Sequence, residues 1–479
     1  MPFKLNKAKV AAALKRGRYD DLAATGFGRL DELMAFLEGF GMLRLLSGIK
    51  DELVRSGAIP RFVLYNLMAL KVLLGEDSLL HLSKGIFRDP GVLRAIGVTA
   101  AEIESGFDTT RNKKNNKPFH IDSVRYGISK VPINEVKQLF SDSVALLKAG
   151  GWLRKARTYV IDSTKIEVLG DYEGMGSLTT KKQVVGKAGE IKTEFTTKKG
   201  FKLFTLAGLT DVGPLVVSAH YCAIKTAEVV GADELIASWG PNWRRKDLLL
   251  MDRGFLDGKR LFDWRKRFGI DFVIPLKKDM DILRDMVGLS RMGRQATGKR
   301  GGTKNKPDLV VEGYSNLDSY ESYPGKLSGI VVTTYKGKKI EPEKRWGFIT
   351  TLSATTPDQA LAVYDSYDQR SRIENQGYRE LKQGFELPRF FGKDTRSQYF
   401  HIFFTLLMYN MVAAYKSKRA DRFIGLGVRR FRSDFIGLAP MVIIYAYPYF
   451  AIFDIRELVV LLGRPPTGNL DNVRIRYVR

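Results

Sequence analysis

Three carboxylates carry the clearest indication of chemistry in the sequence. Asp162 stands in IDST and Asp252 in MDRGF, each at the end of a short apolar run, and Glu374 stands in YDQRSRIENQGYRELK. Singly, an Asp after a strand is often a turn former and a helical Glu is usually solvated. Brought together, the three would bind a divalent cation such as Mg²⁺, because hard cations prefer oxygen ligands.

The residues around Glu374 favour this second reading. Tyr367 to Lys382 is predicted to be a helix, and it carries more charge than a packing helix requires. At about 100° per residue, Tyr367, Arg370 and Glu374 lie within roughly 60° of one another and share one face. If that face is turned toward two other carboxylates, Glu374 is a metal ligand whose basic neighbours hold phosphates.

The segment that must position the aspartates begins at about residue 151, where the pattern changes to strands. The apolar runs predict one strand in RTYVIDST, two strands in GFKLFTLAGLTDVGPLVVSAHY, one in KDLLLMDRGF and one in DFVIPLK. Helical spacing predicts a helix in TAEVVGADELIASW, before KDLLLMDRGF, and another in DGKRLFDWRKRFG, after it. This order predicts an α/β domain that presents Asp162 and Asp252 at strand ends.

The flanking segments differ in character. Residues up to about 105 are predicted to be helical, and residues 276 to 355 form a β-rich stretch that includes a loop in RQATGKRGGTKNK. The basic stretch TTRNKKNNKPF is either a solvated linker or a contact to the DNA backbone. FIGLAPMVIIYAYPYFAIF approaches the length of a membrane span, but its two prolines favour buried strands and a turn.

The composition indicates the kind of partner. A formal net charge of +26 favours a polyanion, because each neutralised phosphate releases condensed counterions. One cysteine, Cys222, rules out an internal disulfide framework and fits a reducing compartment, and the four histidines form no zinc spacing. The start, MPFKLNKAKV, has no apolar stretch of signal-peptide length, so we expect a cytoplasmic protein.

In these motifs the sequence resembles the cut-and-paste DDE transposases of bacterial and archaeal insertion sequences, of the type named insertion sequence four. That type carries a Tyr-x2-Arg-x3-Glu-x6-Lys motif, which Tyr367, Arg370 and Glu374 match in spacing. The contexts of Asp162 and Asp252 look like those of the first two catalytic aspartates. The resemblance covers roughly residues 150 to 420.

The resemblance implies an α/β fold: an RNase H-like catalytic core interrupted by a β-rich insertion, with an α-helical N-terminal domain. The expected parts are a helical DNA-binding domain (1–105), a basic linker and helix (106–150), the first part of the core (151–275), the insertion (276–355), the second part of the core with the Glu374 helix (356–420) and a C-terminal region (421–479).

The resemblance also implies an activity. Asp162, Asp252 and Glu374 would be the catalytic residues and would hold two Mg²⁺ ions, with Mn²⁺ as a substitute. One ion activates water or a 3′-hydroxyl and the other stabilises the leaving oxygen. The protein would cut double-stranded DNA at the inverted-repeat ends of a transposon and join the 3′-OH ends to a target, as a homodimer on nucleoid DNA. The alternatives are a transposase-derived regulator that binds without cutting and a stand-alone RNase H-like nuclease.

Five residues are expected to bind DNA: Tyr367, Arg370, Lys382, Trp346 and Arg253. Trp346 is expected either to stack on a flipped base or to pack within the β-rich insertion. Lys382 comes one residue later than the motif requires, so a regular helix would turn it about 80° away from Glu374.

Two local structures would account for the late lysine. A single-turn π-bulge around Gly377 would absorb the extra residue and bring Lys382 back toward the shared face. In the alternative, a regular helix, Leu381 packs inward and Lys382 is solvated.

Overall fold

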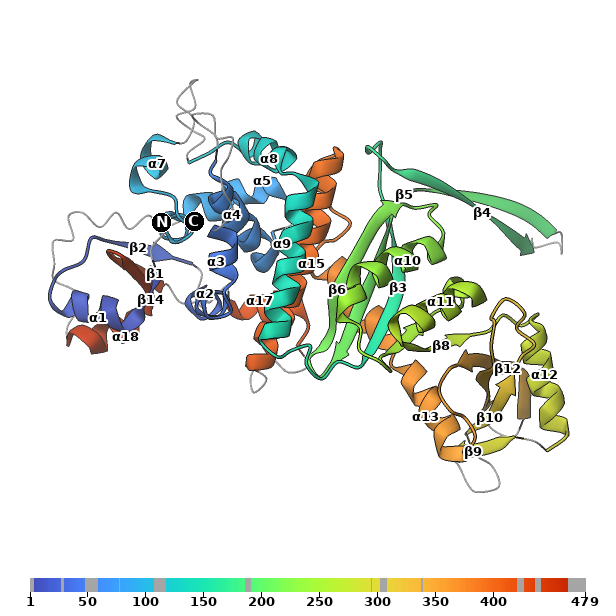
Figure 1. Ribbon diagram of the computed structural model, residues 1–479. Coiled ribbons are helices and arrows are strands. Elements are labelled where there is room, and N and C mark those ends of the chain that lie inside the picture. The colour runs from blue at the N-terminus through green and yellow to red at the C-terminus, as the bar shows by residue number, and fades with distance from the viewer. Residues whose placement is uncertain are drawn as a thin grey trace. The chain divides into compact units, whose positions relative to one another are not determined.

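The computed structural model of the protein describes residues 4–26, 30–47, 59–76, 78–106, 118–185, 191–293, 295–301, 308–336, 339–419, 426–435 and 441–463 (Figure 1). The chain divides into two compact units. The central unit is Gly151–Arg379, and the terminal unit combines Met1–Gly150 with Glu380–Arg479. Residues 109–117 of the basic stretch TTRNKKNNKPF lie outside the described residues.

One large mixed sheet organises the central unit. Among the described residues it has ten strands, in the order β4-β5-β3-β7-β8-β12-β11-β10-β9, with β6 on the other edge of β5. The strands are β3 (Thr158–Glu167), β4 (Gly176–Val185), β5 (Ile191–Thr210), β6 (Gly213–Ala223), β7 (Leu248–Met251), β8 (Asp271–Pro275), β9 (Ala296–Arg300), β10 (Leu309–Leu317), β11 (Leu327–Lys336) and β12 (Lys339–Thr350).

The order of elements predicted from residue 151 onward is confirmed. Strands β3, β5 and β6 come first, followed by helix α10 (Glu228–Trp239), β7, helix α11 (Gly258–Phe268) and β8. β3 runs parallel to β7, and β7 parallel to β8, while β5 is antiparallel to β3 and β6. β4 and the first half of β5 lie outside that prediction, because their polar residues lack an apolar run.

The β-rich stretch continues this same sheet, since β12 pairs with β8. Helix α12 (Asp281–Arg291) packs against β11, and helix α13 (Pro357–Asp368) against β9 and β10. The loop predicted over RQATGKRGGTKNK is wrong in part, because Ala296–Arg300 forms β9 through pairing with β10. Residues 294 and 302–306 of that stretch lie outside the described residues.

The terminal unit is mostly helical. Its helices are α1 (Lys7–Lys15), α2 (Leu30–Gly39), α3 (Met42–Ser47), α4 (Arg61–Leu74), α5 (Leu79–Lys84), η1 (Ile86–Arg88), α6 (Pro90–Ala95), α7 (Ala100–Ser105), α8 (Ile121–Lys130), α9 (Ile133–Ala149), α15 (Thr395–Lys418), α17 (Val428–Phe435) and α18 (Ile455–Leu462). The apolar helix α15 is buried along most of its length and packs against α4, α8 and α9.

The two ends of the chain also meet in a small sheet of this unit. Its strands are β1 (Lys4–Leu5), β2 (Asp21–Thr25), β13 (Met441–Ala446) and β14 (Tyr449–Asp454), in the order β1-β14-β13-β2. β13, β14 and the turn between them confirm the strands predicted within residues 435–453. β1 and β2 correct the helical prediction there, since their partners come from the far end of the chain.

Within the described parts of the chain, helices are too short or too polar to cross a membrane.

Candidate active site

Asp162 lies on β3 at the point where the neighbouring strand β7 ends. The parallel register of β3 and β7 stops at Ile161 opposite Met251, so Asp162 and Asp252 are each one residue beyond the last pair. Equivalent positions on parallel strands project to the same face of a sheet. The prediction that Asp162 stands at the end of its strand is wrong. It lies inside β3, because β3 continues along the antiparallel β5.

Asp252 follows β7 directly, as predicted from its apolar run. Its side chain accepts a hydrogen bond from the backbone N–H of Arg253 (2.8 Å), which caps the short helix η3 (Arg253–Phe255). This contact holds the carboxylate at the end of the strand, while the Arg253 side chain is exposed beside it.

Glu374 comes from a π-helical turn. Helix α13 ends at Asp368, Arg370 lies in a turn, and the π-helix η4 (Ile373–Tyr378) carries Glu374. The single helix predicted from Tyr367 to Lys382 is therefore wrong, since it is interrupted after Asp368. Of the two alternatives at Gly377, the structure has the π-helix.

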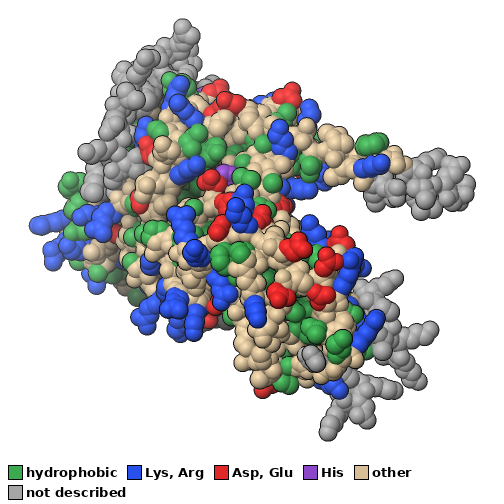
Figure 2. Space-filling model, turned by 45° about the vertical axis from the view of Figure 1, so that its right-hand side comes forward, with side chains coloured by type: hydrophobic (Ala, Val, Ile, Leu, Met, Phe, Trp, Pro, Cys, Tyr) green, Lys and Arg blue, Asp and Glu red, His purple; other side chains and the backbone are tan. Residues whose placement is uncertain are grey.

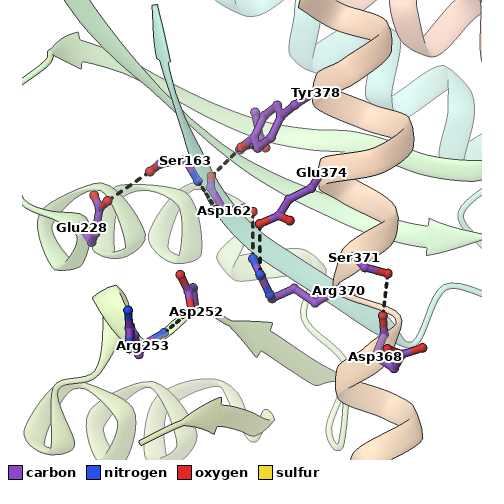
Figure 3. A network of polar contacts seen from close by, with 11 residues as sticks. Asp162, Ser163, Glu228, Asp252, Arg253, Asp368, Arg370, Ser371, Glu374 and Tyr378 are labelled. Atoms are coloured by element: carbon purple, nitrogen blue, oxygen red, sulfur yellow. Dashed lines mark hydrogen bonds and ion pairs between the residues drawn. The ribbon is translucent and has the colours of Figure 1, made fainter. Parts of the chain in front are cut away.

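Arg370 joins the carboxylates (Figure 3). Its guanidinium lies 3.0 Å from Asp162 Oδ2 and 3.0 Å from Glu374 Oε1. It also lies 5.7 Å from the centre of the Tyr367 ring, so Tyr367, Arg370 and Glu374 are together as predicted. The side chain of Arg370 is only 15% exposed, whereas that of Glu374 is 52% exposed. The site thus opens to solvent on the Glu374 side.

The electrostatics of the site are strongly coupled. Burial raises the pKa of Asp162 to about 6; Arg370 and the Ser163 N–H oppose this shift, and Glu374 and Asp252 add to it. Both other carboxylates therefore repel the ionised form of Asp162. A cation placed among the three would relieve this repulsion and favour the ionised form of Asp162.

Burial also raises the pKa of Tyr367 to about 12, so the ring stays a neutral phenol beside Arg370. Burial disfavours the charge of Arg370, but Tyr367 and the three carboxylates raise its pKa above the ordinary value. Arg370 is accordingly a permanent cation within the site.

Tyr378 anchors the π-helix to the strand that bears Asp162, a role that the sequence analysis missed. Its buried hydroxyl donates to the backbone carbonyl of Asp162 (2.7 Å) and bonds the hydroxyl of Thr205 (2.7 Å). Thr205 is the residue on β5 directly opposite Asp162. Arg372 adds a second anchor by donating to the carbonyl of Thr210 on β5 (2.8 Å).

A fourth carboxylate, Glu228, lies at the edge of the site and was also missed. It begins helix α10, accepts from the Ser163 hydroxyl (3.2 Å) and pairs with the buried Lys202 (2.9 Å). Lys202 neutralises it, so Glu228 positions Ser163 beside Asp162. Its place in TAEVVGADELIASW, at the start of a helix that follows three strands, is the only local signal for it.

The remaining predicted residues lie on other elements. Trp346 is on β12 opposite Val332 and is 46% exposed, which is high for a packing residue. Lys382 is half-buried on α14 (Arg379–Gln383), beyond the end of the central unit, and Leu381 beside it is buried. Their roles toward DNA stay predictions.

The donor set fits a divalent metal in its chemistry, since Asp162, Asp252 and Glu374 supply only carboxylate oxygens. As arranged, no three metal-binding side chains of the described residues surround one point. The Arg370 guanidinium bonds two of the three carboxylates, Asp162 and Glu374. A metal ion would have to compete with Arg370 for those oxygens.

The class of the protein follows from the comparison of its sequence with known families, which agrees with a mixed α/β unit that bears Asp162, Asp252 and Glu374. The family model described as the transposase DDE domain matches residues 153–411, more than half of the chain. The chain belongs to this family of transposases. Among curated proteins, none matches it.

Proposed function

We propose that the protein is a DNA transposase that binds transposon inverted-repeat ends, cleaves them by metal-dependent phosphodiester hydrolysis and joins the 3′-OH ends to target DNA. The observation that carries this proposal is geometric: within a transposase DDE domain, Asp162 and Asp252 lie at equivalent positions of neighbouring strands, and Arg370 joins Asp162 to Glu374. Two Mg²⁺ ions held by these carboxylates would activate the attacking oxygen and stabilise the leaving oxygen.

The strand order supports an RNase H-like core. Strands β6-β5-β3-β7-β8 stand in that sequence, with β6 and β5 antiparallel and β3, β7 and β8 parallel. Asp162 then lies on the middle strand of these five, β3, and Asp252 directly follows its neighbour β7. A β-rich insertion between the second aspartate and the glutamate is expected for the insertion sequence four type, and the strands between β8 and α13 support it.

In this proposal the protein's own groups position the DNA. Arg370, which now bonds Asp162 and Glu374, would bond phosphate oxygens once those carboxylates hold metal, because a guanidinium can contact a phosphate in a bidentate way. Tyr367 limits where Arg370 can move, and the exposed Arg253 adds a second cation next to Asp252. Lys382 comes one residue later than the family motif requires, and a π-helix accommodates one extra residue. This supports Lys382 as a further phosphate ligand.

The charge of the chain supports double-stranded DNA as the partner. Lys and Arg exceed Asp and Glu by 26, and Figure 2 shows blue cationic groups at several places on the visible face. We further propose an N-terminal DNA-binding domain, a homodimer assembled on DNA, and action in the cytoplasm on nucleoid DNA. Stacking of Trp346 on a flipped base belongs to the same proposal and rests on the exposure of its ring.

Incubation with duplex DNA from the regions flanking the coding sequence tests the proposal. With Mg²⁺ we expect cuts that leave 3′-OH ends, followed by joined products, and with a chelator neither. Cuts without joining would indicate a stand-alone nuclease. Tight binding without cuts in Mg²⁺ or Mn²⁺ would indicate a regulator and would contradict the proposal.

A further inference from the structure

A two-stranded ribbon extends from the large sheet beyond the body of the central unit (Figure 1). It consists of β4 paired with the first half of β5, from Gly176 opposite Gly200 to Val185 opposite Ile191. β3 stops pairing with β5 at Gly200, so from there outward the strand partner of β5 is β4 alone. The same projection is visible in Figure 2.

Gly200 marks the point where the ribbon leaves the sheet. Its φ of 147° is one that other residues rarely adopt, and a Cβ there would lie 2.1 Å from the carbonyl oxygen of Ile166. The chain therefore uses glycine to let β5 pass β3 closely and continue outward. The need for glycine at this position indicates that the fold specifies where the ribbon separates from the sheet.

The side chains that the structure describes in the ribbon form no buried hydrophobic face. None of its described side chains, on residues 177–181, 193 and 195–199, is buried, and Phe195 is 69% exposed. A two-stranded hairpin without a packed face is only marginally stable in water. The ribbon is thus expected to gain order from a partner.

The chemistry of the ribbon favours DNA as that partner. Residues 176 to 200 contain six lysines and two glutamates. One face presents Lys181, Lys199, Phe195 and a pair of threonine hydroxyls, Thr179 and Thr197, which lie 3.0 Å apart. Hydroxyls and ammonium groups donate to phosphates and base edges, and the major groove admits a two-stranded β-ribbon.

The ribbon is also continuous in sequence with a strand of the site. β5 runs without interruption from the ribbon to Thr205, which lies opposite Asp162. The path from Thr205 to Phe195 along the strand is roughly 33 Å at ~3.3 Å per residue. One helical turn of DNA is about 34 Å, so the ribbon would reach DNA about one turn away from the bond at Asp162.

We propose that this ribbon is a DNA-binding arm that lies in the major groove about one helical turn from the scissile phosphate. The arm would fix the distance between the bound duplex and the carboxylates, because one strand carries both. This inference rests on the proposed function, and it adds a specific contact surface to it.

A shortened arm tests the inference. Residues 180–196 are removed and Thr179 is joined to Thr197 through Asn-Gly, a pair that suits a two-residue hairpin turn. Binding of fluorescent duplexes is measured in a chelator for the intact and the shortened protein, on duplexes of about 8 and about 40 base pairs, which span less than one and about four helical turns. Unfolding midpoints and Mn²⁺ binding report whether the rest of the protein is unchanged.

We expect the shortened protein to bind the longer duplex about tenfold more weakly, with a salt dependence reduced by about two phosphate contacts. Binding of the shorter duplex should change less than twofold. Lys181→Glu and Phe195→Ser should each produce part of the loss, whereas Lys299→Glu, at an exposed strand lysine outside the ribbon, should leave the length dependence intact.

Other outcomes are decisive as well. Equal binding of both duplexes by the shortened and intact proteins would overturn the arm while leaving cleavage by the intact protein, and hence the proposed function, untouched. If the intact protein binds no duplex at all, the proposed function fails first. If light scattering shows that shortening converts a DNA-free dimer into a monomer, the partner of the ribbon is a second copy of the chain and the DNA arm is wrong.

Discussion

Arg370 lies 3.0 Å from Asp162 and at the same distance from Glu374, so a guanidinium bridges the two carboxylates that the proposal assigns to metal. One guanidinium thus offsets part of the negative charge of the three carboxylates before any metal or DNA is bound. The bridge by Arg370 gives one reason why the segment of Glu374 carries more charge than a packing helix requires. The same Arg370 that holds the carboxylates together can exchange them for phosphate oxygens.

Replacement of Arg370 should separate metal binding from DNA handling. In Arg370→Gln we expect Mn²⁺ to bind several-fold more tightly, because the competing cation and its repulsion of the metal are removed. Cleavage should fall by at least about 100-fold, because the phosphate loses its bidentate contact. Titration calorimetry with Mn²⁺ measures the first effect and a nicking assay the second.

Arg370→Lys serves as the control, since it keeps the charge but not the planar fork. It should restore the weaker Mn²⁺ binding and little of the cleavage. If Arg370→Gln binds Mn²⁺ no better than the intact protein, Arg370 does not compete with metal and its role is only structural.

The pKa of Asp162 predicts a pH dependence of stability. Because the folded-state pKa is raised to about 6, the folded protein binds more protons than the unfolded chain between about pH 4 and pH 6. The contribution of Asp162 to stability is thus most favourable at low pH and is lost as the pH rises through 6. The change amounts to about 3 kcal/mol.

Asp162→Asn removes this contribution, so the metal-free variant should gain up to about 3 kcal/mol relative to the intact protein between pH 4 and pH 7. Denaturant unfolding of both proteins in a chelator measures the difference. A difference that is constant with pH would show that Asp162 is ionised throughout the range. Saturating Mg²⁺ should also reduce the difference, since metal favours the ionised carboxylate.

Tyr378 is predicted to be a positioning residue for the metal site. Tyr378→Phe removes the hydroxyl that joins the π-helix to Asp162 and Thr205. We expect Mn²⁺ affinity to fall about tenfold, as for other residues that orient metal ligands, with DNA affinity unchanged. Tyr126→Phe, at an exposed tyrosine of α8, is the matched control.

A loss of overall stability by itself would not distinguish positioning from packing. The Mn²⁺ titration is therefore run below the unfolding range of both variants, together with Thr205→Val, which removes the second bond of the Tyr378 hydroxyl. If Tyr378→Phe unfolds more easily but binds Mn²⁺ as the intact protein does, the hydroxyl stabilises the fold without setting the site.

The sequence predicted the elements that local patterns specify. The apolar runs before Asp162 and Asp252 predicted their strands, and adjacent parallel strands bring the two residues together. The late position of Lys382 made a π-helix one of two alternatives, because an inserted residue in a helix needs such a turn. Both inferences depended on residues close together in the chain.

What the sequence could not predict depends on pairing between distant segments. The bond from Tyr378 to Asp162 requires the register that sets Thr205 opposite Asp162. Strand β1 pairs with β14 from the other end of the chain, so its short polar sequence does not indicate a strand. The ribbon was missed for a different reason, since a strand without a buried face shows no apolar alternation.

The central claim is that Asp162, Asp252 and Glu374 act together in cutting DNA. Its most direct test is cleavage of flanking-region duplex DNA in Mg²⁺ by Asp162→Ala, Asp252→Ala and Glu374→Ala, with binding measured in parallel. Each variant should lose cleavage by at least about 1000-fold while binding DNA nearly as well as the intact protein, because affinity rests on many dispersed cations. Cleavage by any one of the three at close to the intact rate would contradict the assignment.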